Sequence, residues 1–529
     1  MKPQILIIVP KQLNLEKANY NYNFPLGLGY ISSILKKNGY NVDCINLNHY
    51  EGKTENLVKS SLSKKEYDFV GIGNIALGFN STKIIIDSIR EYNPKIKIII
   101  GGMIIIADPK LMFPLLNPDF GVIGEGEETI IELLEAIENK KDLKNIKGLI
   151  FKDVKGDIIL TEQREPIKDI DSLPWPDFEG LEYLEFIEHL HPNFGNAYNF
   201  FDNPRPYPIL GSRGCPFHCT FCYHYSNYRA KSVRSIVEEI RVAIEKYRIN
   251  IIAFYDECIS VNKLRLFEIC EEIKKLREET PWNLNWIPQM TVHNIDEEVL
   301  KRIKESGGAI ISYGFESFSE KVLKSMRKPI TPQMIENAFL KTINAGIGVQ
   351  GNFIFGDVAE TKETAKETLD WWKKNAKGQI NLGFIQPYPG SEIYKHCVRK
   401  GIIKDEANFI KSQLSTMHYY NMTENMTDKE YAKMKKEIFN AVVKYHIFTK
   451  HKIKRLVENV YEVNVKCPFC QKIITYKNIL IEDPILYGFW LYCRNCHQRF
   501  FIVSPLKRLS YKFYSYLKFL QERRDKKKY

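Results

Sequence analysis

Residues 211–224 read GSRGCPFHCTFCYH, a stretch with three cysteines, Cys215, Cys219 and Cys222, and no fourth cysteine beside them. Disulfides explain them poorly, because the chain has 11 cysteines, an odd number, among 529 residues and no secretory signal. Three thiolates can hold three irons of a [4Fe–4S] cluster and leave the fourth open, whereas an electron-carrying cluster normally takes four cysteines. The spacing therefore predicts a cluster with a chemical role.

Zinc is the competing interpretation for these three cysteines. Their C-x3-C-x2-C spacing lacks the paired C-x2-C knuckles that structural zinc prefers. His218 or His224 would then have to serve as a fourth ligand. We favour the cluster.

The cysteines follow the first of six strand patterns, each of which is followed by a helical pattern. Such a series predicts a partial barrel of six βα units with catalytic groups at the carboxyl ends of its strands. The predicted strands are residues 208–212, 250–256, 284–289, 309–315, 347–355 and 380–386.

An earlier βα series predicts a doubly wound, Rossmann-like parallel sheet with strands at 4–10, 41–46, 68–73, 95–100 and 119–124. Ligands of such sheets lie beyond the carboxyl ends of the strands. Glycines there let a bulky ligand approach the backbone, although a glycine pair after a strand is also an ordinary turn. The candidate binding residues are Leu26, Gly27, Gly73, Gly101, Gly102, Gly124, Glu125, Gly126 and Glu127.

The cluster motif CPFHCTFC resembles that of radical S-adenosylmethionine (SAM) enzymes. YDECISVN (255–262), ISYGFES (311–317), GNFIFGDVAET (351–361) and PYPGSEIY (387–394) match further family stretches in the same order. The resemblance implies that the open iron binds SAM, and that its reductive cleavage gives a 5′-deoxyadenosyl radical.

The same resemblance also implies contacts to SAM. The backbone of Phe221 would meet the adenine, and the polar groups at strand ends would face SAM, unless they are simply satisfied carboxylates. The site residues are Phe221, Asp256, Glu257, Gly314 and Glu316. One departure puts contacts from the fifth-strand loop in doubt, because Val358 and Ala359 stand where the family commonly has Pro-Gly.

The amino-terminal sheet resembles the cobalamin (B12)-binding domain of class B radical SAM methyltransferases and anaerobic magnesium-protoporphyrin cyclases. The matching stretches are residues 24–46, IIIGGM (98–103) and VIGEGEETIIELL (122–134). Loop 10–27 holds no histidine, so the resemblance implies cobalt without a protein imidazole, and His49 is predicted to be a surface residue. A methylthiotransferase would need three more cysteines in this domain, which has only Cys44.

Near the carboxyl terminus, CPFC and CRNC place Cys467, Cys470, Cys493 and Cys496 in two C-x2-C knuckles. This spacing predicts a zinc ribbon, with a second iron–sulfur cluster as the alternative. The ribbon would either bind nucleic acid or act as a structural staple. In the basic tail that follows, leucines and Phe513 recur at helical spacing, which suits a membrane surface, RNA or the protein's own barrel.

Composition agrees with a soluble protein of the reducing cytoplasm. The longest apolar run, 98–107, has ten residues, against the ~20 of a membrane span. The last 25 residues hold nine Lys or Arg against two acids, and so carry +7 of the net charge of +12. We expect an α/β protein with these parts: 1–145 cobalamin-binding domain, 146–200 hairpin and proline-rich linker, 201–400 radical SAM barrel, 401–460 helical region, 461–503 zinc-ribbon-like module and 504–529 basic tail.

Two function classes stay open. The first is a cobalamin-dependent radical SAM enzyme, most simply a C- or P-methyltransferase, with a radical cyclase or rearrangement enzyme as the alternative. It would take electrons from a low-potential donor such as ferredoxin or flavodoxin. The second is a zinc-ribbon nucleic-acid-binding protein with a structural barrel. No motif marks the substrate.

Overall fold

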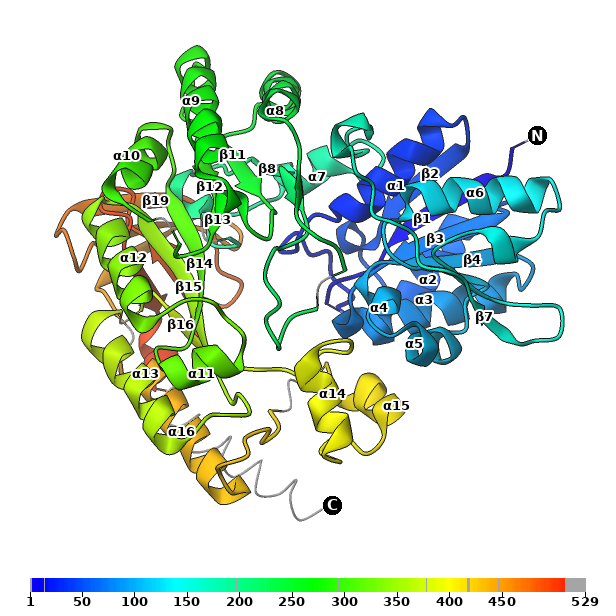
Figure 1. Ribbon diagram of the computed structural model, residues 1–529. Coiled ribbons are helices and arrows are strands. Elements are labelled where there is room, and N and C mark those ends of the chain that lie inside the picture. Colours follow the sequence, from blue (N-terminus) through cyan, green and yellow to red (C-terminus); the bar gives the residue numbers. More distant parts are fainter. Residues whose placement is uncertain are drawn as a thin grey trace. The chain divides into compact units, whose positions relative to one another are not determined.

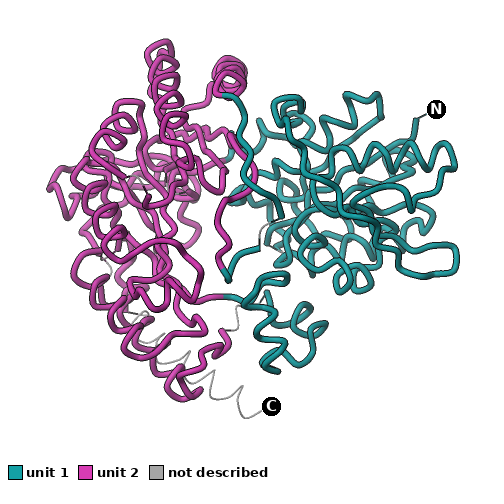
Figure 2. Tube along the Cα trace, viewed as in Figure 1, with its two compact units in different colours: residues 1–189, 220–232, 386–418 teal, residues 190–219, 233–385, 419–529 magenta. Residues whose placement is uncertain are grey.

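The computed structural model describes residues 2–13, 15–195, 197–223, 225–293, 295–376, 378–415, 419–445 and 447–509. The chain forms two compact units (Figure 2). Unit 1 comprises residues 1–189, 220–232 and 386–418, and unit 2 comprises 190–219, 233–385 and 419–529. Within the described ranges, no helix has the length and apolar character needed to cross a membrane. Most of the predicted basic tail lies outside the described residues.

Unit 1 is built on a seven-stranded sheet of order β2-β1-β3-β4-β5-β6-β7 (Figure 1). The first five strands are parallel, and the β6–β7 hairpin extends the sheet with antiparallel pairing. The strands are Gln4–Val9 (β1), Asn41–Asn46 (β2), Phe69–Gly73 (β3), Lys97–Gly101 (β4), Phe120–Val122 (β5), Leu149–Lys152 (β6) and Ile158–Leu160 (β7). The predicted doubly wound sheet is confirmed.

Helices connect these strands and cover the sheet (Figure 1). They are Leu26–Lys37 (α1), Thr54–Leu62 (α2), Phe79–Tyr92 (α3), Met103–Ile106 (α4), Pro109–Leu116 (α5) and Gly126–Glu138 (α6). Unit 1 also contains Tyr183–Glu188 (α7), Glu392–Arg399 (α14), Glu406–Asn408 (α15) and a π-helix over Phe409–Gln413, all of which follow the sheet in the chain. One core cluster packs Leu35 of α1 and Leu133 of α6 against Ile7 and Phe151 of the sheet.

The proline-rich segment 171–180 is packed rather than free. Asp177 accepts hydrogen bonds from Ser32 Oγ at 2.5 Å and Lys36 Nζ at 2.6 Å, both on α1. Pro176 lies so close to Gly29 that an added Cβ there would meet it at 2.9 Å. This segment therefore belongs to the body of unit 1.

Unit 2 contains the six predicted barrel strands, with the third split at Pro288. One parallel sheet has the order β12-β11-β8 and the next has β13-β14-β15-β16. A parallel bridge between Trp286 and Gly308 links them. The strands of these two sheets are Pro206–Ile209 (β8), Ile251–Phe254 (β11), Asn285–Ile287 (β12), Gln289–Met290 (β13), Ile310–Glu316 (β14), Gly348–Phe355 (β15) and Asn381–Phe384 (β16). The short strand Ser212–Arg213 (β9) follows β8 and lies outside both sheets. The partial barrel is confirmed.

Helices follow the barrel strands in the expected alternation (Figure 1). They are Val233–Tyr247 (α8), Lys263–Glu279 (α9), Glu297–Glu305 (α10), Glu320–Ser325 (α11), Pro332–Asn344 (α12), Lys362–Asn375 (α13) and Asp428–Lys444 (α16). Cys258 and Cys270 are buried here and Cys397 is buried in unit 1, so these three cysteines are core residues.

Two small antiparallel sheets end the described chain. They comprise His451–Val457 (β17), Val460–Lys466 (β18) and Ile473–Leu480 (β19) in one sheet, and Gly488–Tyr492 (β20) and Arg499–Val503 (β21) in the other. They share one apolar core that includes Val463, Tyr476, Leu491 and Phe500.

Candidate active site and metal centre

The three motif cysteines lie on the loop that follows β8 and β9. Cys219 is buried, Cys215 is partly buried and Cys222 is exposed, and none is in a disulfide. Cys215 and Cys219 belong to unit 2, whereas Cys222 belongs to unit 1. Among the described residues, the sulfurs of these three cysteines do not form a group in which all atoms lie within 4.8 Å of one another, the spacing that a single metal ion would require. The cysteines of a [4Fe–4S] cluster each bind a different iron, so their sulfurs need not lie as close together as the ligands of one metal ion.

Asp256, at the end of β11, anchors the start of this loop. The carboxylate is fully buried and accepts hydrogen bonds from the Gly211 N–H at 2.8 Å and from the Ser212 hydroxyl. Arg265 donates to the Gly211 carbonyl at 2.7 Å. Burial raises the pKa of Asp256 to about 6. Asp256 thus positions the cluster loop through its backbone, and contact with SAM stays a prediction for it.

Glu257, the neighbour of Asp256, is exposed and lies near the Cys215 thiol. Burial raises the pKa of Cys215 to about 11, and the Glu257 carboxylate adds to that shift. Phe221 is partly buried and His218 is exposed, while His224 lies outside the described residues. The predicted SAM contacts of Phe221 and Glu257 stay predictions.

The structure adds Lys328, a residue that the sequence reasoning missed. Lys328 donates to Glu316 Oε1 at 3.2 Å, and both side chains are largely buried. Burial lowers the pKa of Lys328, but the negative charges of the Glu316 carboxylate and of the Cys219 and Cys215 sulfurs in their thiolate form outweigh it, so the pKa is raised. A buried ammonium therefore lies within the electrostatic reach of two motif cysteines. In the sequence, Lys328 is marked only by the proline that follows it, and this pattern does not indicate a functional site.

Gly314 makes room for this ion pair. A Cβ at position 314 would meet Glu316 Oε1 at 2.6 Å and Lys328 Nζ at 2.8 Å. The strand is irregular between Gly314 and Glu316, and Glu316 has a left-handed backbone with φ 63°. The glycine and the bulge together turn the Glu316 carboxylate toward Lys328, so Gly314 acts here through packing.

The loop that departs from the family pattern holds a buried carboxyl. Glu360 accepts from Thr364 Oγ1 at 2.6 Å and from the Gly356 N–H at 3.3 Å, directly before α13. Burial raises the pKa of Glu360 to about 7. Thr361 and Thr364 form a capping box at the helix start. Glu360 and Thr361 therefore shape this loop and begin α13.

The glycines at the carboxyl edge of the unit 1 sheet divide into two groups. Gly27 and Gly101 have nothing within 4 Å of an added Cβ, so they leave open space. Gly73 and Gly102 are close to neighbouring atoms, because a Cβ would meet Leu28 at 2.9 Å and the Asn74 carbonyl oxygen at 2.7 Å, respectively. The backbone is therefore open on its Cβ side at Gly27 and Gly101 and crowded on that side at Gly73 and Gly102.

The loop 124–127 is shaped by Tyr225 and Arg229, two residues that follow the cluster motif. A Cβ on Gly124, where φ is +94°, would lie 1.9 Å from the Tyr225 hydroxyl oxygen. Glu125 accepts from Arg229 at 2.7 and 3.0 Å and from the Ile167 N–H at 2.7 Å. The predicted cofactor role of Glu125 stays a prediction, and its observed contacts are internal. Leu26 and Glu127 are buried and Gly126 begins α6.

Tyr223, the residue after Cys222, reaches the carboxyl edge of the sheet. Its hydroxyl donates at 3.2 Å to the carbonyl of Ile106, the last residue of α4, which is the short helix that follows β4. Together, Tyr223 at the end of α4 and Tyr225 against Gly124 hold the chain that leaves the cluster motif on unit 1. Within unit 1, Cys222 therefore directly precedes in sequence a residue, Tyr223, that contacts the chain following β4. Doubly wound sheets bind their ligands beyond the carboxyl ends of such strands.

The prediction that His49 is a surface residue is wrong. His49 is 8% exposed. Its Nε2 lies 2.7 Å from Tyr22 Oη, and its Nδ1 lies 2.8 Å from Glu182 Oε2. Tyr20 also stacks on the ring. A single sequence could not show this burial, because Glu182 comes from a distant segment that packs over the loop.

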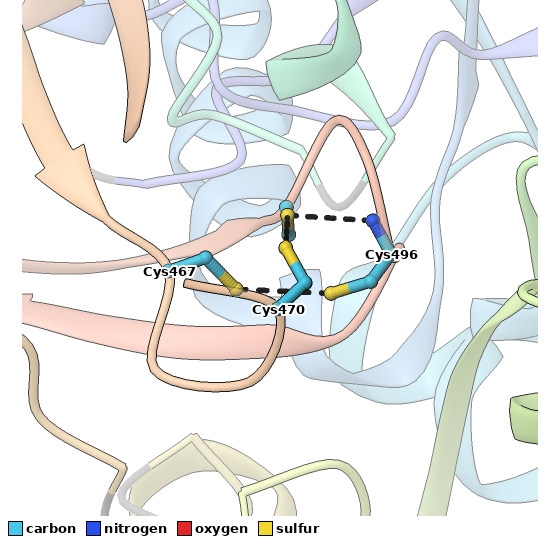
Figure 3. A group of neighbouring side chains, drawn as sticks. Cys467, Cys470 and Cys496 are labelled. Carbon is cyan, nitrogen blue, oxygen red and sulfur yellow. Dashed lines mark hydrogen bonds between the residues drawn. The ribbon is translucent and has the colours of Figure 1, made fainter. Parts of the chain in front are cut away.

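The four carboxyl-terminal cysteines come together from two loops that face each other (Figure 3). Their sulfurs all lie within 4.8 Å of one another, with 3.7 Å between Cys467 and Cys496 and 3.6 Å between Cys470 and Cys493. Zn–S bonds of about 2.3 Å in a tetrahedron give sulfur–sulfur edges of about 3.8 Å, whereas a disulfide requires about 2.05 Å. The geometry fits one tetrahedral metal ion.

The two knuckles repeat one backbone pattern. The Cys467 N–H donates to the Lys472 carbonyl at 2.9 Å, and the Cys493 N–H donates to the Gln498 carbonyl at 3.0 Å. Gln471 and His497, each directly after a second cysteine, have left-handed φ values of 62° and 57°. This repeat confirms the predicted four-cysteine site on two tight turns.

Comparison with known proteins covers both units. A B12 binding domain model matches residues 18–134 and a radical SAM superfamily model matches residues 209–371. An uncharacterized methyltransferase of Pyrococcus horikoshii is 27% identical over 410 residues, which are 75% of this chain and 84% of that protein. An anaerobic magnesium-protoporphyrin IX monomethyl ester cyclase of Rubrivivax gelatinosus is 25% identical over 383 residues, 70% of this chain and 66% of that protein.

The solved structures agree on the fold. The radical S-adenosylmethionine methyltransferase TsrM from Kitasatospora setae superimposes with a TM-score of 0.61 at 18% identity, over 75% of this chain and 77% of that one. The two family models together cover more than half of the 529 residues, on the sheet and the partial barrel described above. The chain belongs to the B12-binding radical SAM family.

Proposed function

We propose that this protein is a cobalamin-dependent methyltransferase that replaces a hydrogen on an unactivated carbon or phosphorus centre with a methyl group. Relatives named as methyltransferases support this choice. The cofactors would supply the chemistry: two SAM molecules and two electrons convert R–H to R–CH₃, with S-adenosylhomocysteine, 5′-deoxyadenosine and methionine as products. The protein's task is to hold these groups and shield the radical.

The contact between Tyr223 and Ile106 is the observation that carries the proposal. It binds the residue after Cys222 to the last residue of α4, the short helix that follows β4 on the carboxyl side of the B12-type sheet. A cofactor on that edge and a cluster held by Cys222 would therefore be separated along the chain only by Tyr223 and its contact with Ile106. A methyltransferase that combines a methyl carrier with a radical needs this adjacency.

Named residues take separate parts in this proposal. Cys215, Cys219 and Cys222 would hold the cluster, with Lys328 as the positive charge near the first two. The open space at Gly27 and Gly101 would admit the cobalamin ring system. His49 would not bind cobalt, because both of its ring nitrogens already have partners at hydrogen-bond distance.

We also propose zinc as the ion of the four-cysteine site. Four sulfur ligands at tetrahedral spacing suit Zn²⁺, and closed four-cysteine sites with short C-x2-C turns are typical of structural zinc. A low-potential protein such as ferredoxin or flavodoxin would supply the electrons, in the reducing cytoplasm that free thiols require.

A radical cyclase is the second candidate, because the Rubrivivax gelatinosus relative carries that activity in its name. The products separate the two functions. A methyltransferase forms S-adenosylhomocysteine alongside 5′-deoxyadenosine, whereas SAM cleavage for ring closure does not require loss of the methyl group.

The test is anaerobic reconstitution of the full chain with iron, sulfide and hydroxocobalamin, followed by reduction with SAM present. We expect both nucleoside products from the wild type and no 5′-deoxyadenosine from Cys219→Ala. Cys270→Ser, which alters a buried cysteine of α9 outside the motif, is the matched control and should retain both products. Cleavage that survives Cys219→Ala would refute the assignment, and 5′-deoxyadenosine without S-adenosylhomocysteine would favour the cyclase.

A further inference from the structure

The four-cysteine module, residues 461–503, packs on one end of the partial barrel within unit 2. His497, directly after Cys496, has its Nδ1 3.1 Å from the Ala309 carbonyl oxygen. A Cβ on Gly348 would lie 2.8 Å from the His497 carbonyl oxygen. Ala309 directly precedes β14 and Gly348 begins β15. The second knuckle therefore touches the amino-terminal ends of these two strands.

Tyr492, directly before Cys493, is inserted beneath the same strands. Its side chain is fully buried, and its hydroxyl donates to the Val349 carbonyl at 3.2 Å. Its backbone N–H donates to Asn199 Oδ1 at 3.0 Å. Tyr492 shares a small apolar cluster with Ala309 and Ile310. A ring anchored from both sides in this way is a core contact, not a surface contact.

Arg499 binds the amino-terminal end of β16. Only 2% of this residue is exposed. Its guanidinium donates at 2.7 Å to the carbonyl of Gly378, three residues before β16, and at 2.8 Å to Oδ1 of Asn381, the first residue of β16. Gln379 exchanges two hydrogen bonds of 2.8 Å with the Arg499 backbone. A buried arginine with this many fixed acceptors is costly to displace.

The other arginine of the second knuckle is also used internally. Arg494 donates to the Asn199 carbonyl at 2.8 Å and pairs with Asp202 at 2.7 Å. Both Asn199 and Asp202 precede β8. Arg494 and Arg499 are the charges that this knuckle would offer to a phosphate backbone. Their intramolecular contacts favour a role inside the protein over nucleic-acid binding.

We propose that this metal-bound module is the floor of the barrel: it closes the amino-terminal ends of β14, β15 and β16, and the ion keeps the closing surface folded. The inference rests on the proposed zinc site. Catalytic groups of such barrels stand at the opposite, carboxyl ends of the strands, whereas the amino-terminal face serves stability. The eight residues of β15 separate its two ends by about 23 Å, so the ion takes no part in the chemistry.

Hydrogen exchange of the anaerobic full chain tests this inference, with zinc content measured on the same samples. We expect one zinc per chain in the wild type and none in Cys493→Ser. Amide protection at 309–312 and 348–351 should fall at least tenfold in that variant. Cys270→Ser, a change to a buried barrel cysteine outside the module, is the matched control and should keep the zinc and the protection at both sites.

A second variant separates docking from metal binding. Arg499→Met removes the contacts to Gly378 and Asn381 without touching a cysteine, so it should keep zinc while protection at 378–382 falls. If zinc is lost but amide protection stays at the wild-type level at 309–312, 348–351 and 378–382, the inference that the module closes the barrel is refuted. The zinc proposal would still stand. A wild type without zinc would overturn the zinc proposal, and Arg499→Met would still report on docking. Single-stranded RNA binding that Cys493→Ser abolishes, with exchange unchanged, would make the module a nucleic-acid site instead.

Discussion

Lys328→Met should destabilise unit 2 by leaving Glu316 as an unpaired buried carboxylate. The two charges are 3.2 Å apart with side chains only 15% and 11% exposed. At that distance and an effective dielectric constant of about 20, their attraction is about 5 kcal/mol, most of which offsets the cost of taking both charges out of water. Removal of one partner from a buried pair typically costs ~3–5 kcal/mol, and we expect a loss in that range.

The double variant Lys328→Met with Glu316→Gln removes both charges and tests this reason directly. It should recover most of the lost unfolding free energy, because no buried charge is then left unpaired. Urea unfolding followed by circular dichroism under anaerobic conditions measures both variants. The matched control is Lys366→Met, which breaks an exposed i,i+4 pair with Asp370 and should leave the unfolding midpoint unchanged.

In the double variant, we expect the unfolding free energy to recover while reductive SAM cleavage stays low. Lys328 is the positive charge near Cys215 and Cys219, and the net charge around such a site sets how readily an electron can be added there. Reductive SAM cleavage should therefore fall at least tenfold in Lys328→Met and stay low in the double variant. Wild-type cleavage in the double variant would show that Lys328 only balances Glu316, and a double variant as unstable as the single one would refute the charge-pair account.

Three further predictions concern other sites. His49→Gln should leave the visible spectrum of bound hydroxocobalamin unchanged, and a spectral shift would mean that the imidazole binds cobalt. Glu360 has a pKa of about 7 in the folded chain against 4.5 for the ordinary carboxyl, so stability is lost as pH rises through 7. Glu360→Gln should remove about 3 kcal/mol of that pH dependence, measured by urea unfolding from pH 4 to 8; an unchanged slope would contradict it. Gly124→Ala should destabilise unit 1 by about 1–3 kcal/mol because Tyr225 and a positive φ leave no room, whereas Gly27→Ala should be neutral, and equal melting temperatures for the two would refute this account.

Sequence alone determined the two βα series, the cluster motif and the four-cysteine site. These features are local: strand and helix patterns follow from neighbouring residues, and metal ligands on one tight turn keep a short, recognisable spacing. The strand bounds at β1, β2 and β3 consequently agree with expectation within a residue. Cys467 and Cys493 could be assigned for the same reason, although 26 positions separate them.

Only the tertiary structure decided how distant segments complete these sites. Lys328 pairs with Glu316 through the turn after α11, Glu182 covers His49 from more than a hundred residues away, and Tyr225 fills the space above Gly124. Arg499 carries no motif, yet it joins the metal module to the barrel. Such contacts are set by packing between elements remote in sequence, where burial and charge compensation depend on the whole fold, so no local pattern could reveal them.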